Sequence, residues 1–500
     1  MKLIRISLLS TLVLFASFRC AWADNNVTLG QARDVAAYAI AIENGMDKYD
    51  VASARLVYQI NNPVLDIPVA YYFNVGSNAF VIVAGHKSSM PIIGMSADDT
   101  LNVDNMPPAM QWWVESYSEM IAEAQLQDLQ PANDVEKVWA TYEDHTQIPS
   151  SGKATNWLID TKWDQGYNEN PTYNLYCPVH FHKYCYTGCV ATAAAQIVNY
   201  YQFPAVGRYT KAYYLTYTVD GETTIRTSPV ATTIFYNQTF YDYAHMPLEL
   251  YRSSDSAEIK AVALLMFHIG VAVDAEYGID GTSAISENLI NCMKRYFKYK
   301  NSSQLYRSSF TDAKWCDTLR YSIDRKAPLY FSAASPEGGD IHANGHAFIC
   351  HGYHPTSTNL FRMNWGWGGS GDGWYNMESI NGLNPPSSYG GRYNFCSRQA
   401  VLMGLMPPDD SNRYMTIHVA EEGTLHAAYP NPACYQVTIP YSLQQNNTSV
   451  LEIYDVAGRQ MEQRVLTPGE GEVRINVTAY PKGIYLYRLK GGTMRKFVVQ

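Results

Sequence analysis

"YTGCVATAAAQIVNYY", residues 186–201, places a single cysteine directly before a long run of helix-forming residues. Apolar residues recur from Val190 at i+3, i+4, i+7, i+8 and i+11, which predicts a buried amphipathic helix that ends before Pro204. Cys189 would then lie in the first turn, where unsatisfied N–H groups and the helix dipole favour a thiolate. Gly188 would leave room for a substrate backbone. The thiol could be half of a disulfide, a metal ligand or a nucleophile.

A second stretch offers the proton acceptor that a thiol nucleophile requires. It reads "NGHAFICHGYHPTSTNLFRMNWGWGGSGDGW", residues 344–374, and two apolar runs flank the turn-forming letters "HPTST". This pattern predicts an antiparallel hairpin that turns near Pro355. Such a turn would place His346 opposite Asn364 on the neighbouring strand. An imidazole held by a side-chain amide is the base-and-orienter pair that cysteine nucleophiles use.

The first residues of the chain predict export. Two basic residues precede an apolar run from Ile6 to Phe18, and small residues around Ala23 follow. This three-part pattern is typical of a secretory signal peptide, residues 1–23, which is cleaved after Ala23. The apolar run is too short to span a membrane, and the residues before Cys20 are wrong for a lipid-modified cysteine.

The remaining cysteines are sparse for a disulfide-stabilised protein. Eight of the nine are left when the signal peptide is removed from the 500-residue chain. Seven of these lie between Cys177 and Cys396, an odd number, so at least one thiol in this block is expected to be free. Cys177 and Cys185 could form a small disulfide.

Zinc binding is the main alternative to nucleophilic chemistry. The thiol is preceded by a group of potential ligands: Cys177, His180, His182 and Cys185. Their spacing fits no common zinc finger, however, and zinc would consume the thiolate that catalysis needs. We therefore expect no metal and no other cofactor. A net charge of −9 without a basic patch also argues against nucleic acid as a partner.

Composition divides the mature chain into three folded blocks. Residues 24–150 combine the helical patterns "GQARDVAAYAIAI" and "PPAMQWWVESYSEMIAEAQLQ" with a hairpin that has "GSN" at its turn, which predicts a small α+β domain. The polar segment 145–154 leads into the largest block, residues 151–405. A linker, residues 406–426, precedes residues 427–500, whose short alternating strands predict a β-sandwich.

The motifs of the largest block resemble those of a known family. "TGCVATAAAQ", "NGHAF" and "MNWGWGGSGDGWY", in this order and spacing, are similar to the streptopain family of papain-like cysteine peptidases. The resemblance implies an α+β fold with two parts. A helical part would carry the catalytic cysteine at a helix N-terminus, and an antiparallel β part would carry the catalytic histidine.

The resemblance also implies roles for individual residues. Cys189 matches the nucleophile that forms a thioester acyl-enzyme, and His346 matches the general base and acid. Gln165 matches the glutamine whose side-chain amide, with the Cys189 backbone N–H, forms the oxyanion hole. A secreted binding protein on an inactive peptidase scaffold is the third class of function considered, but every one of these positions holds a competent residue.

Three further positions resemble the residues that surround the family's histidine. Trp365 and Trp367 match tryptophans that wall the histidine, and Asn364 aligns with the papain-type asparagine that orients it. In streptopain-like enzymes tryptophan packing takes over much of that orienting role, so Asn364 is the weakest match.

The flanking blocks resemble the remaining parts of such a precursor. Residues 24–150 are similar to the family prodomain, which implies an intramolecular inhibitor and a zymogen. Residues 427–500, with "YPNP", "GIYLYRL" and a final "KFVVQ", are similar to type IX secretion sorting domains. The expected partners are protein or peptide substrates, the enzyme's own prodomain and a secretion machinery. The expected location is the cell surface or the medium, reached through the periplasm of a Gram-negative bacterium.

Overall fold

The computed structural model divides the chain into two compact units. The first consists of Met1–Lys162 and Ser303–Met403, and the second of Trp163–Ser302 and Gly404–Gln500. The predicted peptidase block therefore contributes to both units. The structure describes residues 25–46, 48–145, 157–213, 217–219, 222–224, 232–300, 302–334, 345–357, 359–380, 383, 399–408, 423–443, 449–456, 459–489 and 494–500. The predicted signal peptide and most of both predicted linkers lie outside these residues.

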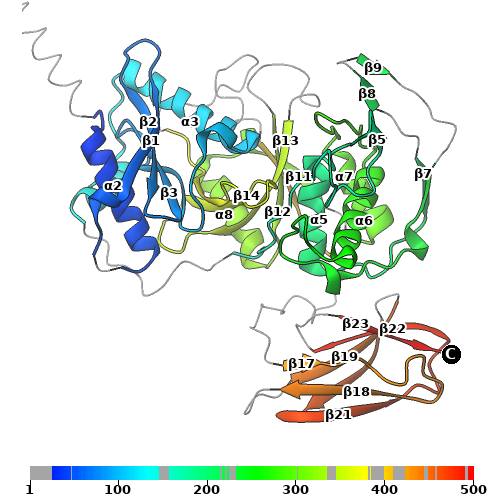
Figure 1. The fold of residues 1–500 in the computed structure, drawn as a ribbon. Coiled ribbons are helices and arrows are strands. Elements are labelled where there is room, and N and C mark those ends of the chain that lie inside the picture. Colours follow the sequence, from blue (N-terminus) through cyan, green and yellow to red (C-terminus); the bar gives the residue numbers. More distant parts are fainter. Residues whose placement is uncertain are drawn as a thin grey trace, which may run out of the picture. The chain divides into compact units, whose positions relative to one another are not determined.

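A ten-stranded antiparallel sheet is the framework of the first unit (Figure 1). The expected prodomain supplies four of its strands and residues 303–403 the other six, and the two groups join where β4 pairs with β15. Gly94 of β4 lies opposite Tyr375 of β15. A side chain at position 94 would come within 2.6 Å of the Tyr375 ring, so this pairing requires glycine. In sheet order the strands are β1 (Ala54–Asn61), β2 (Pro68–Val75), β3 (Ala79–Ala84), β4 (Ile92–Ser96), β15 (Gly373–Asn376), β14 (Leu360–Asn364), β13 (Gly345–Tyr353), β12 (Leu329–Ala334), β16 (Gln399–Met403) and β11 (Ser303–Tyr306).

Both predicted prodomain helices and the predicted hairpin are present in this unit. Thr28 and Gln31 form a capping box at the start of the first helix, which satisfies backbone N–H groups there. The second begins at Pro108, whose missing N–H costs nothing at a first helical position. The hairpin of β2 and β3 turns over residues 76–78, as expected. The helices of the unit are α2 (Leu29–Glu43), α3 (Pro108–Leu126), α4 (Asn133–Glu143) and α8 (Asp312–Asp324), with the short 3₁₀ helices η1 (Val51–Ser53), η2 (Val103–Asn105) and η5 (Arg307–Ser309).

The hairpin of β13 and β14 exists, but its predicted register is wrong. Asn364 lies opposite Ile349, and His346 lies opposite Ala333 of β12. Two features explain the difference. The turn is centred near Ser357 instead of Pro355, and a bulge after Cys350 moves the pairing back by one residue, so that Asn364 lies opposite Ile349 instead of Cys350.

The second unit contains a helical part. Helix α5 packs against α6, and α6 packs against α7. Gln202, in the left-handed conformation, ends α5 two residues before Pro204, as predicted. The elements of this part are α5 (Cys189–Tyr201), α6 (Ser256–Ala272), α7 (Asn288–Phe297), the strands β5 (Val179–His180), β6 (Lys183–Tyr184), β7 (Thr210–Tyr213), β8 (Tyr217–Val219), β9 (Glu222–Thr224) and β10 (Thr232–Phe235), and the 3₁₀ helices η3 (Tyr236–Gln238) and η4 (Tyr243–His245).

The C-terminal part of this unit is the predicted β-sandwich. A three-stranded sheet, β17-β18-β21, and a four-stranded sheet, β20-β19-β22-β23, share one apolar core. Alternate residues such as Val437, Ile439, Leu451 and Ile453 point into that core. The strands are β17 (Gly423–Leu425), β18 (Gln436–Leu443), β19 (Ser449–Asp455), β20 (Gln460–Leu466), β21 (Gly469–Asn476), β22 (Gly483–Leu489) and β23 (Arg495–Val499). Among the residues described, no helix combines the length and apolarity needed to cross a membrane.

Candidate active site

Cys189 is the first residue of α5, as the sequence predicts. Gly188 caps the helix with φ +85° and ψ 149°, a conformation that side chains other than glycine rarely adopt. An added Cβ at this position would also come within 3.0 Å of Thr282. The backbone N–H groups of the first turn of α5 therefore begin at the half-buried thiol, where they favour negative charge.

Gln165 is held next to the start of this helix. Its carbonyl accepts a hydrogen bond from the Thr187 N–H at 3.0 Å, two residues before Cys189. Gly166, with φ +97°, follows, and a Cβ there would lie 2.2 Å from Oδ1 of Asn174. The Gln165 carbonyl is thus tied to the residue two positions before Cys189, and the backbone after Gln165 packs closely against Asn174.

Buried polar contacts fix the first turn of α5 itself. Thr192 Oγ1 donates to the Gly188 carbonyl at 3.0 Å and lies 3.0 Å from Thr187 Oγ1. The Gln196 side chain accepts from the Trp163 N–H at 3.3 Å. Of the apolar positions predicted to face the core, Tyr201 is only half-buried, and the other five are buried: Val190, Ala193, Ala194, Ile197 and Val198.

His346 lies on β13 in the first unit, between two tryptophans. The Trp367 ring meets it edge-on, with the centroids 6.0 Å apart. The Trp112 ring, from α3 of the prodomain, meets it at 5.9 Å. The sequence did not predict the contact with Trp112. The only signal for it was the tryptophan pair in the letters "QWW" of the predicted prodomain helix.

Asn364 holds the loop that follows β14. Its Nδ2 donates to the Thr161 carbonyl at 2.7 Å, and its Oδ1 accepts from the Gly366 N–H at 3.0 Å. The ring contact of Trp367 with His346 places this tryptophan beside the histidine, where the resemblance leads us to expect it.

Trp365 is fully buried below this loop and is held by a buried carboxyl group. Its N–H donates to Asp372 Oδ1 at 2.8 Å, and its indole Nε1 donates to the Gly371 carbonyl at 3.0 Å. Burial raises the pKa of Asp372 to about 7, although the hydrogen bond from Trp365 opposes the shift. Asp372 was not singled out from the sequence because an acidic residue in a glycine-rich loop carries no distinctive pattern.

Among the described residues, the other predicted ligands and thiols form no second centre. Cys177 and Cys185 are buried thiols that form no disulfide, and burial raises the pKa of Cys185 to about 11. The His180 ring packs against Phe181, with 4.1 Å between centroids. Within the described part of the chain, no group of three or more His, Cys, Asp or Glu side chains is placed to hold a metal ion.

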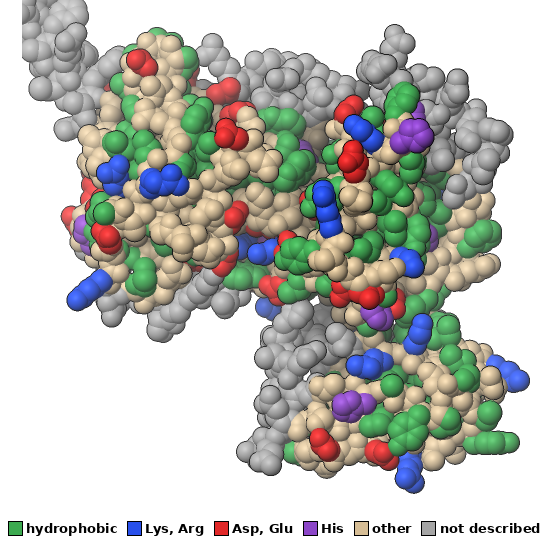
Figure 2. Space-filling view, viewed as in Figure 1, with side chains coloured by type: hydrophobic (Ala, Val, Ile, Leu, Met, Phe, Trp, Pro, Cys, Tyr) green, Lys and Arg blue, Asp and Glu red, His purple; other side chains and the backbone are tan. Residues whose placement is uncertain are grey.

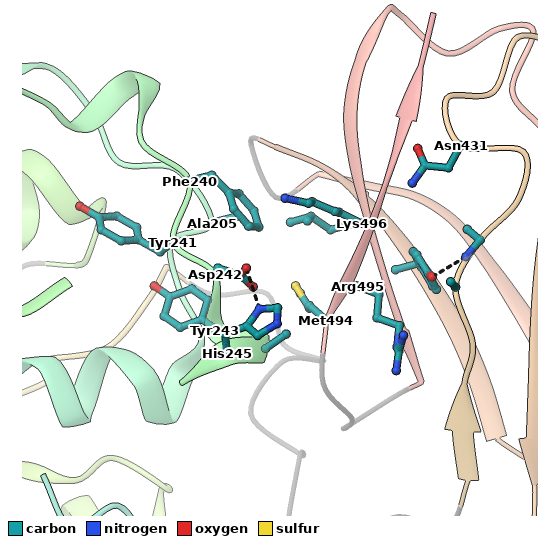
Figure 3. Close-up of a pocket in the computed structure, with 15 residues that line it drawn as sticks. Ala205, Phe240, Tyr241, Asp242, Tyr243, His245, Asn431, Met494, Arg495 and Lys496 are labelled. Atoms are coloured by element: carbon teal, nitrogen blue, oxygen red, sulfur yellow. Dashed lines mark hydrogen bonds and ion pairs between the residues drawn. The ribbon is translucent and has the colours of Figure 1, made fainter. Parts of the chain in front are cut away.

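The second unit also has a pocket of about 310 Å³ beside the sandwich (Figure 3). Phe240 and Asp242 line it from one side, and Met494 and Lys496 line it from the other. His245 contacts Asp242 there at 2.9 Å. The pocket contains none of the predicted catalytic residues. Acidic and basic side chains are interspersed over the face of the molecule shown in Figure 2.

Three family models match the chain in consecutive segments. Residues 24–121 match the model described as Spi protease inhibitor, residues 163–375 the Peptidase C10 family, and residues 427–500 the Secretion system C-terminal sorting domain. The order is the one that the sequence predicts.

Individual relatives are also cysteine peptidases or their precursors. Streptopain of Streptococcus pyogenes is 29% identical over 352 residues, which are 67% of this chain and 80% of streptopain. The thiol protease/hemagglutinin PrtT of Porphyromonas gingivalis is 26% identical over 392 residues, which are 76% of this chain and 42% of PrtT. A fragment of Prevotella intermedia prointerpain A has a TM-score of 0.55 at 25% identity and covers 71% of this chain and 99% of the fragment. These likenesses confirm the predicted α+β fold with a prodomain.

Proposed function

Because the chain is a streptopain-like cysteine peptidase that carries an inhibitor-like prodomain and a type IX sorting domain, we propose that Cys189 is its nucleophile, His346 its general base and acid, and Gln165 part of its oxyanion hole. The sorting domain marks the protein for export by a Gram-negative bacterium to its surface or the medium. The substrates are peptide bonds of proteins or peptides, and no cofactor takes part.

The proposed reaction has two acyl-transfer steps. His346 takes the thiol proton while Cys189 Sγ attacks the scissile carbonyl, and the Gln165 amide and the Cys189 N–H stabilise the oxyanion. Collapse of the tetrahedral intermediate breaks the C–N bond, and His346 gives its proton to the leaving amine. Water then attacks the thioester with His346 as base, which releases the acid and restores the thiol.

The position of Cys189 is the observation that carries this proposal. It is a half-buried thiol at the first residue of a helix, whereas Cys292, Cys316 and Cys350 are buried in the peptidase block. Burial raises the pKa of the Cys292 thiol to about 11 and that of Cys316 to about 12, which makes both poor nucleophiles.

Alkylation tests the proposal. Iodoacetamide should label Cys189 first and abolish peptide hydrolysis, and Cys189→Ala should do the same, whereas a chelator should leave hydrolysis unchanged. Loss of hydrolysis to the chelator with alkylation harmless would favour the metal alternative. A wild-type protein that binds peptides but cleaves none would favour the inactive binding scaffold.

The prodomain is proposed to keep the precursor inactive. Its helix α3 places Trp112 against His346, and its sheet continues the sheet that carries His346. The proposed boundaries are residues 24–150 for the prodomain, 151–405 for the peptidase, 406–426 for the linker and 427–500 for the sorting domain. Cleavage between about 140 and 155 would release the prodomain, because this region is polar and turn-rich in sequence. Cys189→Ala should therefore remain a full-length precursor under conditions in which the wild type matures.

A further inference from the structure

A carboxylate of the prodomain is buried between two hydrogen-bond donors of the peptidase. Glu43 ends α2 and is only 3% exposed. Its Oε1 accepts from Trp374 Nε1 at 2.9 Å, and its Oε2 lies 2.9 Å from His354 Nε2. Both partners belong to the segment that matches Peptidase C10, whereas Glu43 belongs to the segment that matches the inhibitor. The contact therefore joins the two domains, and His354 follows the end of β13 opposite to the end that carries His346.

The peptidase itself determines which nitrogen of His354 donates. Nδ1 lies 3.2 Å from the Ser357 N–H and 3.4 Å from the Thr356 N–H. A backbone N–H can only donate, so Nδ1 accepts and the ring proton is on Nε2, which faces Glu43. The His354 ring also meets Trp374 edge-on, with 5.2 Å between centroids. Both donors are thus oriented by the peptidase before a carboxylate arrives, which lowers the entropic cost of binding.

Because it is buried, this contact is screened less by salt and water than the contact of Asp98, another acidic residue of the prodomain. Asp98 pairs with Arg362 at 3.4 Å, but the Asp98 side chain is 30% exposed, so salt and water screen that pair. Glu43 and His354 are both almost completely buried. A change that leaves either side of such a contact without its partner is costly because the remaining polar group has no access to water.

We propose that His354 and Trp374 form a carboxylate-binding socket on the peptidase, and that Glu43 fills this socket and determines how tightly the prodomain is retained. The socket acts apart from the substrate cleft. Its role in regulation rests on the proposed zymogen function, but the binding itself does not require catalysis.

The test measures prodomain retention in an inactive protein. In full-length Cys189→Ala, the segment 148–154 is replaced by the recognition sequence of a site-specific protease, and the chain is cut there. Dissociation of the cut prodomain is then followed by size-exclusion chromatography over a dilution series. The Kd of the prodomain should rise about 10- to 100-fold for Glu43→Gln, because the amide would turn an N–H₂ group toward a donor. The exposed Glu136 provides the matched control, and Glu136→Gln should change the Kd less than twofold.

Two further measurements separate the socket from a folding defect. Trp374→Phe removes one donor, and combining it with Glu43→Gln should weaken retention by less than the product of the single effects, since both act on one contact. The effect of Glu43→Gln should also persist at 0.5 M NaCl, because the pair is buried. Equal Kd values for the Glu43 and Glu136 variants, or independent effects of Glu43→Gln and Trp374→Phe, would overturn the proposal. Because dissociation is measured directly and not through hydrolysis, failure of Cys189 as nucleophile would leave the Kd comparison unaffected.

Discussion

Replacing Gly188 by alanine should damage both catalysis and folding. The backbone at position 188 has φ +85° and ψ 149°, which is close to a region used almost only by glycine. Holding alanine there costs about 1–3 kcal/mol. The new methyl group would also lie 3.0 Å from both Cγ2 and the carbonyl oxygen of Thr282, so the helix start must shift or the neighbour must yield. Such overpacking adds about 1–3 kcal/mol.

The shift would be transmitted directly to the thiol. Cys189 is the next residue, and the neighbouring Thr187 is tied to Gln165 by its N–H. A displacement of about 1 Å between the proposed nucleophile and the proposed oxyanion hole can lower the rate about 100-fold. We therefore expect Gly188→Ala to reduce kcat/KM for a fluorogenic peptide about 100-fold and to destabilise the helical part by about 2–6 kcal/mol.

Two measurements and one control make this prediction specific. Stability is measured by denaturant unfolding in the inactive Cys189→Ala background, and kcat/KM on the matured active enzyme. Gly281→Ala is the control, because an added Cβ at position 281 meets nothing within 4 Å and no positive φ is involved. If Gly188→Ala behaved like Gly281→Ala in both measurements, the argument that only glycine fits this position would be refuted. Thr282→Ser should restore part of the stability by removing Cγ2, but the backbone strain would remain.

Three other predictions concern the remaining parts of the chain. The pKa of Asp372 is raised to about 7, so the folded state binds a proton that the unfolded state releases near pH 4, and stability should fall as pH rises from about 4 to 7. Asp372→Asn should flatten this dependence in thermal unfolding measured across that range, and an unchanged slope would contradict it. Trp112→Ala should raise the hydrolysis of a small peptide by the uncut precursor, because it removes a ring that covers His346; unchanged hydrolysis would mean that Trp112 does not contribute to latency. Deleting residues 427–500 should leave folded protein in the periplasm, and normal levels in the medium, measured by immunoblot, would exclude these residues as the export signal.

Sequence patterns predicted the elements that depend only on residues close together in the chain. Helix α5 follows from its apolar spacing alone, and Cys189 at its start follows from the glycine before it. The register of β13 and β14 could not be predicted in this way. It depends on a bulge and on a turn in which His354 Nδ1 accepts N–H groups of Thr356 and Ser357, and these contacts form only in the folded loop.

Contacts between segments that are far apart in the chain could not be predicted from the sequence for a different reason. The pairing of β4 with β15 and the burial of Glu43 against Trp374 each join residues that are more than 250 positions apart. Neither partner has an unusual neighbourhood in sequence. A buried glutamate at the end of an alanine-rich helix resembles an ordinary exposed helix terminus until the second domain is in place.

The continuous sheet has a consequence for the enzyme after the prodomain has left. Strand β15 pairs with β4 on one side, so removing residues 24–150 turns it into an edge strand whose N–H and C=O groups face solvent. Exposed edges are templates for pairing with other chains, and proteins limit the hazard by keeping such strands short. Strand β15 has four residues, and its ladder with β4 consists of two residue pairs. Release of the prodomain thus breaks few backbone hydrogen bonds and leaves an edge too short to favour aggregation.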